Sequence, residues 1–194
     1  MWLAMVFPAG GGRTLSQFAL VSYIPGPLAL FLDQLRLDLT PGCNPRAHVT
    51  VLPPRPLDPN ADLPATIQEL ADEARQANPI EITLGEIEVF PITDVIYLSI
   101  ARGERELHAL HENLNSGQLE YDGPYPYHPH VTIAQDLEPG KVMESADRAR
   151  RRWADYAGSR RFTVDCLSFV QNVAPNMWLD VAKLPMGVPV GVGQ

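Results

Sequence analysis

The chain lacks the long apolar run, the positive charge and the dense cysteines that define several large protein classes. None of its apolar segments approaches the roughly 20 residues that a membrane-spanning helix needs. Its 15 Lys and Arg are outnumbered by 23 Asp and Glu, which gives a formal net charge of −8. Long nucleic acids are held through many phosphates by basic surfaces, so this balance argues against such a partner. A small phosphate ester in a local pocket remains compatible with it.

The few cysteines and the two chain ends indicate how the protein is organised. Cys43 and Cys166 lie far apart and outside any metal-ligand spacing, so we expect reduced thiols in a cytoplasmic protein. Residues 1–16 have no basic start and too short an apolar run for a signal peptide, and we expect a flexible N-terminal extension. The Gly- and Pro-rich residues 186–194 are expected to form a C-terminal tail. Residues 17–185 then form one domain, of a size that can hold two lobes around a shared core.

Apolar periodicity predicts alternating strands and helices along this domain. Alternation with period two and short β-branched runs indicate strands, and apolar stripes at spacings of three and four indicate helices. Strands are expected at residues 17–24, 47–52, 80–90, 95–101, 130–135, 161–173 and 177–184, and helices at 27–38, 63–77, 103–116 and 139–158. The order of elements in the second half echoes that of the first. This repetition predicts an α+β fold built by internal duplication.

The tripeptide His-Val-Thr occurs twice, inside the runs AHVTVL and YHPHVTI, about 80 residues apart. Side chains alternate between the two faces of a strand, so His48 and Thr50 share one face and His130 and Thr132 share another. If a pseudo-two-fold axis relates the two halves, these four polar side chains meet in one cleft. The sequence therefore predicts two imidazoles and two hydroxyls that face each other.

Such a set of side chains suits chemistry on a phosphodiester. A neutral imidazole can take a proton from an attacking water or hydroxyl, and a protonated imidazole can give one to the leaving oxygen. The Thr hydroxyls can donate to the non-bridging phosphoryl oxygens, where charge develops, without a metal.

Two His-aliphatic-Thr elements at this spacing, each on a strand, resemble the 2H phosphoesterase superfamily. The second element, YHPHVTIAQ, and the opening strand SQFALVSYIP resemble its 2′-5′ RNA ligase and cyclic phosphodiesterase branch, and the resemblance covers about residues 17–184. It implies a bilobal fold in which two lobes of antiparallel strands, with helices outside, face a central cleft. It also implies metal-independent opening of 2′,3′-cyclic phosphates, or making and breaking of 2′-5′ links, in nucleotides or at RNA ends.

The resemblance assigns roles to the four motif residues. His48 and His130 would be the catalytic histidines, and Thr50 and Thr132 would contact the phosphate. The partner it implies is a small nucleotide or an RNA 3′ end, with no cofactor and no metal. We expect a monomer that does not associate with membranes.

Other interpretations of the histidines stay open. The matched pair could be ordinary strand histidines, or the domain could hold a nucleotide or RNA end without turning it over. His128 and His130 could instead bind a metal, although the acidic residue and the late histidine of a typical site are missing. His108 and His111, on one predicted helix, are expected to be solvated or to cap the helix.

Aromatic and basic residues near the motifs have two interpretations each. Tyr23, Tyr97 and Tyr127 could stack a base beside the phosphate, although core packing is the more common role of tyrosine. Arg46 and Arg55 flank the first motif and could steer an anionic substrate, or they could be exposed loop arginines.

Overall fold

The computed structural model describes residues 17–58, 60–138, 140–174 and 176–187. These residues form two four-stranded antiparallel sheets and four α-helices, which confirms the predicted α+β class. The expected extension at residues 1–16 and most of the expected tail lie outside the described residues. None of the helices in the described part combines the length and the apolar character needed to cross a bilayer.

The elements follow one another in an order close to the predicted one. The strands are β1 (Gln17–Tyr23), β2 (His48–Pro56), β3 (Ile80–Val89), β4 (Ile96–Arg102), β5 (Val131–Ala134), β6 (Arg161–Val164), β7 (Cys166–Ala174) and β8 (Met177–Pro185). The helices are α1 (Gly26–Leu39), α2 (Leu63–Gln76), α3 (Glu104–Leu114) and α4 (Val142–Ala154), with a short 3₁₀ helix at Gly117–Leu119.

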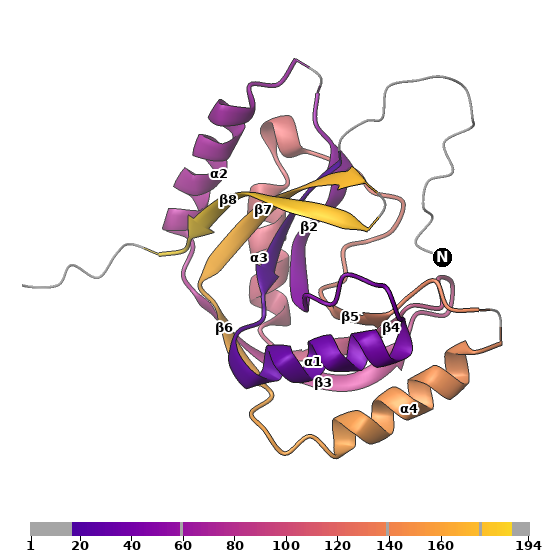
Figure 1. Cartoon of the computed structure of the whole chain (residues 1–194). Helices are drawn as coiled ribbons and strands as arrows, with labels where there is room; N and C mark the ends of the chain where they lie inside the picture. The colour runs from indigo at the N-terminus through magenta and orange to yellow at the C-terminus, as the bar shows by residue number, and fades with distance from the viewer. Residues whose placement is uncertain (1–16, 59, 139, 175, 188–194) are drawn as a thin grey trace, which may run out of the picture.

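Each sheet is completed by a strand from the other half of the chain. Sheet A has the order β2-β1-β7-β8, and sheet B has the order β5-β4-β3-β6. β1 and β2 therefore correspond to β4 and β5, whereas β3 joins the sheet of the second half and β7 joins that of the first. This exchange leaves β2 and β5 as edge strands, and the two edges contact each other (Figure 1).

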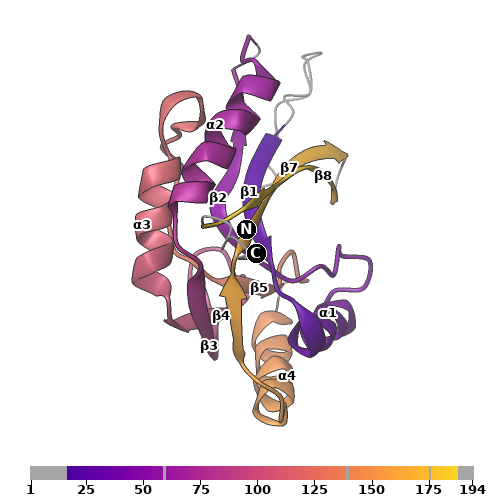
Figure 2. The same ribbon diagram turned by 90° about the vertical axis from the view of Figure 1, so that its left-hand side faces the viewer.

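The helices are exchanged in the same way. α1 follows a strand of sheet A but packs against β5 of sheet B, and α3 follows a strand of sheet B but packs against β2 of sheet A. α4 joins α1 on sheet B, and α2 and α3 lie together on one side of sheet A (Figure 2). Each motif strand is thus supported by a helix that belongs to the other half of the chain.

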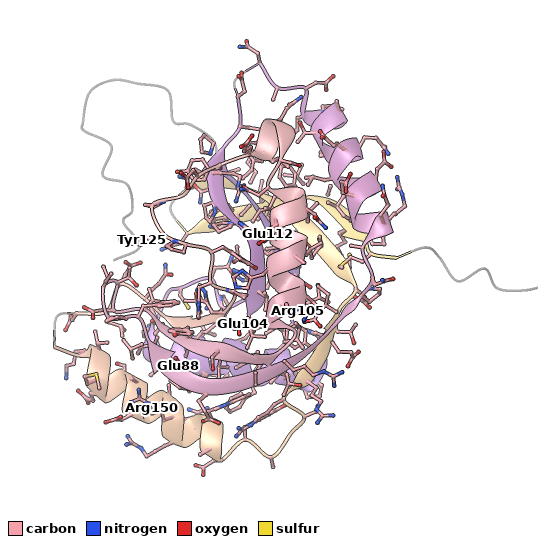
Figure 3. The ribbon with its side chains drawn as sticks, turned by 180° about the vertical axis from the view of Figure 1, so that it is seen from behind. Glu88, Glu104, Arg105, Glu112, Tyr125 and Arg150 are labelled. Atoms are coloured by element: carbon pink, nitrogen blue, oxygen red, sulfur yellow. The ribbon has the colours of Figure 1, made fainter. Side chains whose placement is uncertain are left out.

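The helices dock through apolar stripes and a few side-chain bonds to the sheets. α1 buries a row of leucines at helical spacing, Leu28, Leu32, Leu35 and Leu39. In α4, Trp153 is buried and donates from Nε1 to the carbonyl of Gly85 at 2.8 Å. Arg150, labelled on the same helix in Figure 3, donates from Nε to the carbonyl of Ile87 at 3.3 Å.

The predicted strand 161–173 is wrong in one respect, because it is two strands in two sheets. β6 pairs with β3 in sheet B, and β7 pairs with β1 in sheet A. The single residue between them is Asp165, whose carbonyl accepts from the backbone of Met186 at 2.8 Å. Apolar residues continue on both sides of Asp165 without Gly or Pro, so the sequence carries no local signal for the change of sheet. Met186, which we assigned to the tail, is buried.

The predicted end of the first motif strand is also wrong. The strand predicted at residues 47–52 continues through Pro53 and Pro54 to Pro56 in β2. Proline cannot donate to a neighbouring strand, and β2 is an edge strand with one unpaired side. The extension carries Arg55 into the interior, where it is 2% exposed.

Gly103 lets the chain turn from β4 directly into α3. Its φ is +94°, and a Cβ there would lie 2.5 Å from Cδ1 of Ile82 and 2.8 Å from the carbonyl oxygen of Glu81. The Gly103→Ala variant should therefore lose about 3 kcal/mol of unfolding free energy, from the left-handed backbone and the clash together. Urea denaturation measures this loss.

Gly42→Ala is the matched control, because Gly42 has φ +88° and open space where a Cβ would lie. It should lose only about 1 kcal/mol, the cost of the backbone conformation alone. Equal losses in the two variants would show that the contact with β3 does not constrain Gly103.

Candidate active site

The structure brings the two His-Val-Thr motifs together at the facing edges of the sheets. His48 and Thr50 lie on β2, His130 directly precedes β5, and Thr132 lies on β5. All four side chains are partly exposed. Within the described residues, neither Thr hydroxyl makes a hydrogen bond with another protein group. Both hydroxyls are therefore available to a ligand.

Both motif histidines are held by the same local hydrogen bond. Nδ1 of His48 lies 2.8 Å from the carbonyl oxygen of Arg46, and Nδ1 of His130 lies 2.6 Å from that of His128. A carbonyl oxygen only accepts, so Nδ1 carries the hydrogen in each ring. The proton that each imidazole can gain or lose therefore sits on Nε2.

Burial and neighbouring charges lower the pKa of both motif histidines. Burial lowers the pKa of His48 to about 4, the bond to the Arg46 carbonyl opposes this shift, and the charges of Arg36, His130 and Arg46 lower the pKa further. Burial also lowers the pKa of His130 to about 4, against the bond to the His128 carbonyl. Both imidazoles are consequently neutral near pH 7 in the free protein.

Each motif histidine has a tyrosine ring at its edge. The Tyr23 ring lies 6.1 Å from that of His48 at 79°, and the Tyr97 ring lies 5.5 Å from that of His130 at 70°. Phe90 stacks on Tyr97 at 3.9 Å. Tyr97 is buried, which agrees with the packing role considered for it.

A residue that the sequence reasoning missed joins the two motifs. Arg36, on α1, donates from Nη1 to the carbonyl of Thr132 and from Nη2 to that of Asn44 at 3.0 Å. On the same helix, Asp33 accepts from the backbone of Ala47 at 2.7 Å. α1 thus fixes both the segment before His48 and the strand after His130. The available signal was a single arginine four residues after Leu32, at the border of an apolar stripe.

The other motif strand is held by a stacked pair. His111, on α3, lies 2.7 Å through Nδ1 from the carbonyl of Val51, and the hydroxyl of Tyr127 donates to that of Thr50 at 2.9 Å. The two rings stack at 3.9 Å with an angle of 4°. The solvated or capping role expected for His111 is therefore wrong, because its ring reaches β2 instead. Tyr127 supports the motif strand through its hydroxyl.

The two flanking arginines differ. Arg55 is neither exposed nor free to steer a substrate, because it is buried and donates to the carbonyl of Leu119 at 2.6 Å and to Asn115. Burial lowers its pKa to about 10. Arg46 is exposed, and it forms an ion pair with Asp180.

His128 lies outside any described group of metal-ligand side chains. In the described ranges, no cluster of three or more His, Cys, Asp and Glu side chains could hold a metal ion. The His128 ring instead meets the edge of Phe90 at 5.2 Å and lies 6.2 Å from the ring of His130.

Replacing Arg36 should destabilise the fold. Arg36→Met leaves the carbonyls of Thr132 and Asn44 without their donor, and should lower the unfolding free energy by about 2–3 kcal/mol. Arg148→Met is the control, since Arg148 reaches the carbonyl of Asp38 only at the surface, at 3.4 Å. It should change stability by less than about 0.5 kcal/mol in the same urea titration. Similar losses would contradict the anchoring role of Arg36.

The motif histidines should make the folded protein sensitive to acid. Their pKa is near 6.5 when unfolded and about 4 when folded, so the unfolded state binds more protons between these values. The unfolding free energy should therefore fall as the pH drops through this window. In a His48→Gln, His130→Gln double variant, this acid-induced loss of unfolding free energy should be smaller than in the parent protein. We expect a difference of about 2 kcal/mol for the two residues together, allowing for solvent screening.

Urea denaturation near neutral pH and near pH 4.5 measures the difference. The carboxylates shared by both proteins titrate alike and cancel in the comparison. The same acid loss in the double variant and the parent would show that the two imidazoles do not resist protonation.

Comparisons with known proteins relate this arrangement to a family. A family model described as the 2′-5′ RNA ligase superfamily matches residues 24–176. A protein of Oceanobacillus iheyensis, named as a candidate phosphoesterase, is 35% identical over 87 residues, which are 44% of this chain and 51% of that protein. The match therefore spans about half the length of this relative. A candidate phosphoesterase of Bacillus cytotoxicus is 28% identical over 134 residues, 64% of this chain and 77% of that protein.

Solved structures share the fold at low sequence identity. E. coli LigT complexed with 3′-AMP aligns with a TM-score of 0.60 and 13% identity, over 88% of this chain and 98% of that chain. A Thermus thermophilus protein aligns with a TM-score of 0.65 and 16% identity, over 88% and 97% of the two chains. The family model covers well over half of the chain, including both motifs, and the chain belongs to the 2′-5′ RNA ligase superfamily.

Proposed function

We propose that the protein is a metal-independent phosphodiesterase that acts on 2′,3′-cyclic phosphates or 2′-5′ links of nucleotides or RNA ends. The observation that carries this proposal is the matched pair of histidines. Both Nδ1 atoms are engaged by backbone carbonyls, and both Nε2 atoms are left for proton transfer. Family membership and relatives named as candidate phosphoesterases support the same class of reaction.

The chemistry follows from the two imidazoles. In the hydrolysis of a cyclic phosphate, Nε2 of one neutral histidine takes a proton from the attacking water as its oxygen bonds to phosphorus. The other histidine, protonated, gives its proton to the ribose oxygen as the bond from phosphorus to that oxygen breaks. The product is a phosphomonoester. The same sequence, with the 5′-hydroxyl of a second RNA end as nucleophile in place of water and the 3′ oxygen as leaving group, would join the two ends through a 2′-5′ link.

The negative charge of the bound phosphate would raise the pKa of the histidine that acts as the acid. Both histidines have a pKa of about 4 in the free protein, so a proton must be stabilised before one of them can act as the acid. A bound phosphodiester carries a negative charge next to both rings, and an opposite charge favours the protonated form. Since the two Nδ1 bonds are equivalent, the orientation of the substrate selects which histidine is acid and which is base.

Thr50 and Thr132 would hold the phosphate. On their strands they share the face of His48 and His130, two residues away in each case. Their hydroxyls would donate to the non-bridging oxygens, on which negative charge grows in the transition state. E. coli LigT, which shares the fold, has been solved with 3′-AMP and with phosphate, which supports a nucleotide or phosphate ligand here.

Turnover without metal, dependent on both histidines, is the expected result. In the presence of EDTA, the protein should open a nucleoside 2′,3′-cyclic phosphate or cleave a 2′-5′ dinucleotide. His48→Ala and His130→Ala should each lower kcat by about 10²–10⁴-fold, the contribution of one general acid or base. Thr50→Val and Thr132→Val should each lower it by about 10²-fold through the loss of one donor. Chromatography of the products measures the rates and reports whether the 2′ or 3′ phosphate forms.

His108→Ala is the matched control, since His108 has no hydrogen bond to the motif strands and meets only the Tyr127 ring, at 5.2 Å. It should leave kcat within about threefold. Turnover that EDTA abolishes and one divalent metal restores would contradict the mechanism. Tight binding of the cyclic phosphate without turnover would instead favour a domain that holds nucleotides without cleaving them.

A further inference from the structure

Arg46 presents a fixed guanidinium beside His48. Its Cζ lies 3.3 Å from the centre of the Tyr23 ring, and its Nη1 donates to both carboxylate oxygens of Asp180, at 3.1 Å each. The hydroxyl of Tyr23 donates to the same carboxylate at 2.8 Å. Burial and this bond raise the pKa of Tyr23 to about 12, so its hydroxyl stays a donor. Arg46 lies in the loop before β2. Tyr23, from β1, and Asp180, from β8, hold its side chain in one orientation.

The arginine keeps donors that the protein does not use. A guanidinium has five N–H donors, and only those on Nη1 of Arg46 reach another described side chain. Within the described part of the chain, no carbonyl or carboxylate accepts from Nη2 or Nε, and 48% of the side chain is exposed. A planar guanidinium that is already stacked and paired loses little freedom when it binds a ligand.

The unused donors lie close to the candidate active site. The Tyr23 ring, on which the guanidinium is stacked, lies 6.1 Å from that of His48. The charge of Arg46 is felt at His48, and the carbonyl of Arg46 receives the Nδ1 hydrogen of that ring. An anion bound to Arg46 would therefore lie within one nucleotide of a phosphodiester placed between the histidines.

Arg46 is set apart from the other cations near the motifs by its access to solvent. Arg36 is half-buried and donates from both Nη atoms to backbone carbonyls, and Arg55 is buried. Neither can receive a phosphate without losing its structural bonds. Arg46 gives only Nη1 to the protein, so a ligand can bind while the contacts with Tyr23 and Asp180 persist.

We propose that Arg46, held by Tyr23 and Asp180, binds a second phosphate group of the substrate, next to the phosphodiester that reacts. The inference rests on the proposed function and narrows its substrate class to nucleotides or short RNA 3′ ends that carry a further phosphate on the 5′ side. Asp180 offsets the charge of Arg46, so selection depends on the direction of N–H donors more than on net charge. A protein with net charge −8 is suited to such a short ligand and not to a long polyanion.

Binding of matched ligands tests the subsite independently of turnover. Adenosine 3′-phosphate and adenosine 2′-phosphate are each compared, by calorimetry, with the derivative that carries one additional phosphate on O5′. The additional phosphate should tighten binding about ten-fold, as expected of one charge-assisted hydrogen bond. In Arg46→Gln, the ligands with and without the additional phosphate should bind with nearly equal affinity. Because the readout is a ratio of two affinities, a partial loss of folded protein leaves it unchanged.

Arg161→Gln controls for the loss of one positive charge, since Arg161 is exposed on β6, at the edge of sheet B far from β5. It should keep the full ten-fold advantage. An advantage that is absent in the parent protein, or that survives in Arg46→Gln, would overturn the subsite. An equal loss of affinity for both ligands would also overturn it, by assigning Arg46 to the shared nucleoside.

The same experiment separates this inference from the proposed function. Failure of all four ligands to bind would remove the nucleotide substrates on which both depend. Binding with no effect of the additional phosphate would remove only the role of Arg46, and the turnover assay on cyclic phosphates would still decide the reaction.

Discussion

The site depends on two edge strands that contact each other without pairing. β2 and β5 end their respective sheets, and an unpaired edge offers carbonyls that another strand could take up. In this protein, side chains donate to these carbonyls instead of a neighbouring strand. Arg36 donates to the carbonyl of Thr132, His111 to that of Val51 and Tyr127 to that of Thr50. Because these carbonyls are already satisfied, neither edge needs the backbone of the other strand as a partner.

The exchange of elements makes this arrangement a property of the whole chain. Arg36 comes from α1 in the first half but holds the strand of the second, and His111 comes from α3 in the second half but holds the strand of the first. With β3 and β7 exchanged as well, neither half can complete its own sheet, and each motif strand packs against a helix of the other half. Folding of one half is therefore coupled to folding of the other, and the histidine pair exists only in the assembled domain.

The sequence predicted the parts of the site that depend on local periodicity. Alternation along a strand places His48 with Thr50 and His130 with Thr132, and the structure brings the two pairs to neighbouring edges. Contacts between distant segments were not predictable in this way. Asp165 changes sheets without any turn residue, and Arg36 has the sequence context of an ordinary helix. Their roles depend on which strand lies opposite, which periodicity along one segment does not encode.

The duplication supplies two equivalent histidines, and their surroundings make them different. Two cations, Arg36 and Arg46, lower the pKa of His48, whereas His130 has Phe90 and Tyr97 at its edge. A substrate would therefore meet more positive charge beside His48, although each histidine has a tyrosine ring at its edge. Under the proposed mechanism this asymmetry gives the substrate a preferred direction, although the hydrogen bonds that fix the two imidazoles are the same. In that mechanism, the symmetric pair would supply both an acid and a base because the bound ligand, not the protein alone, breaks the symmetry.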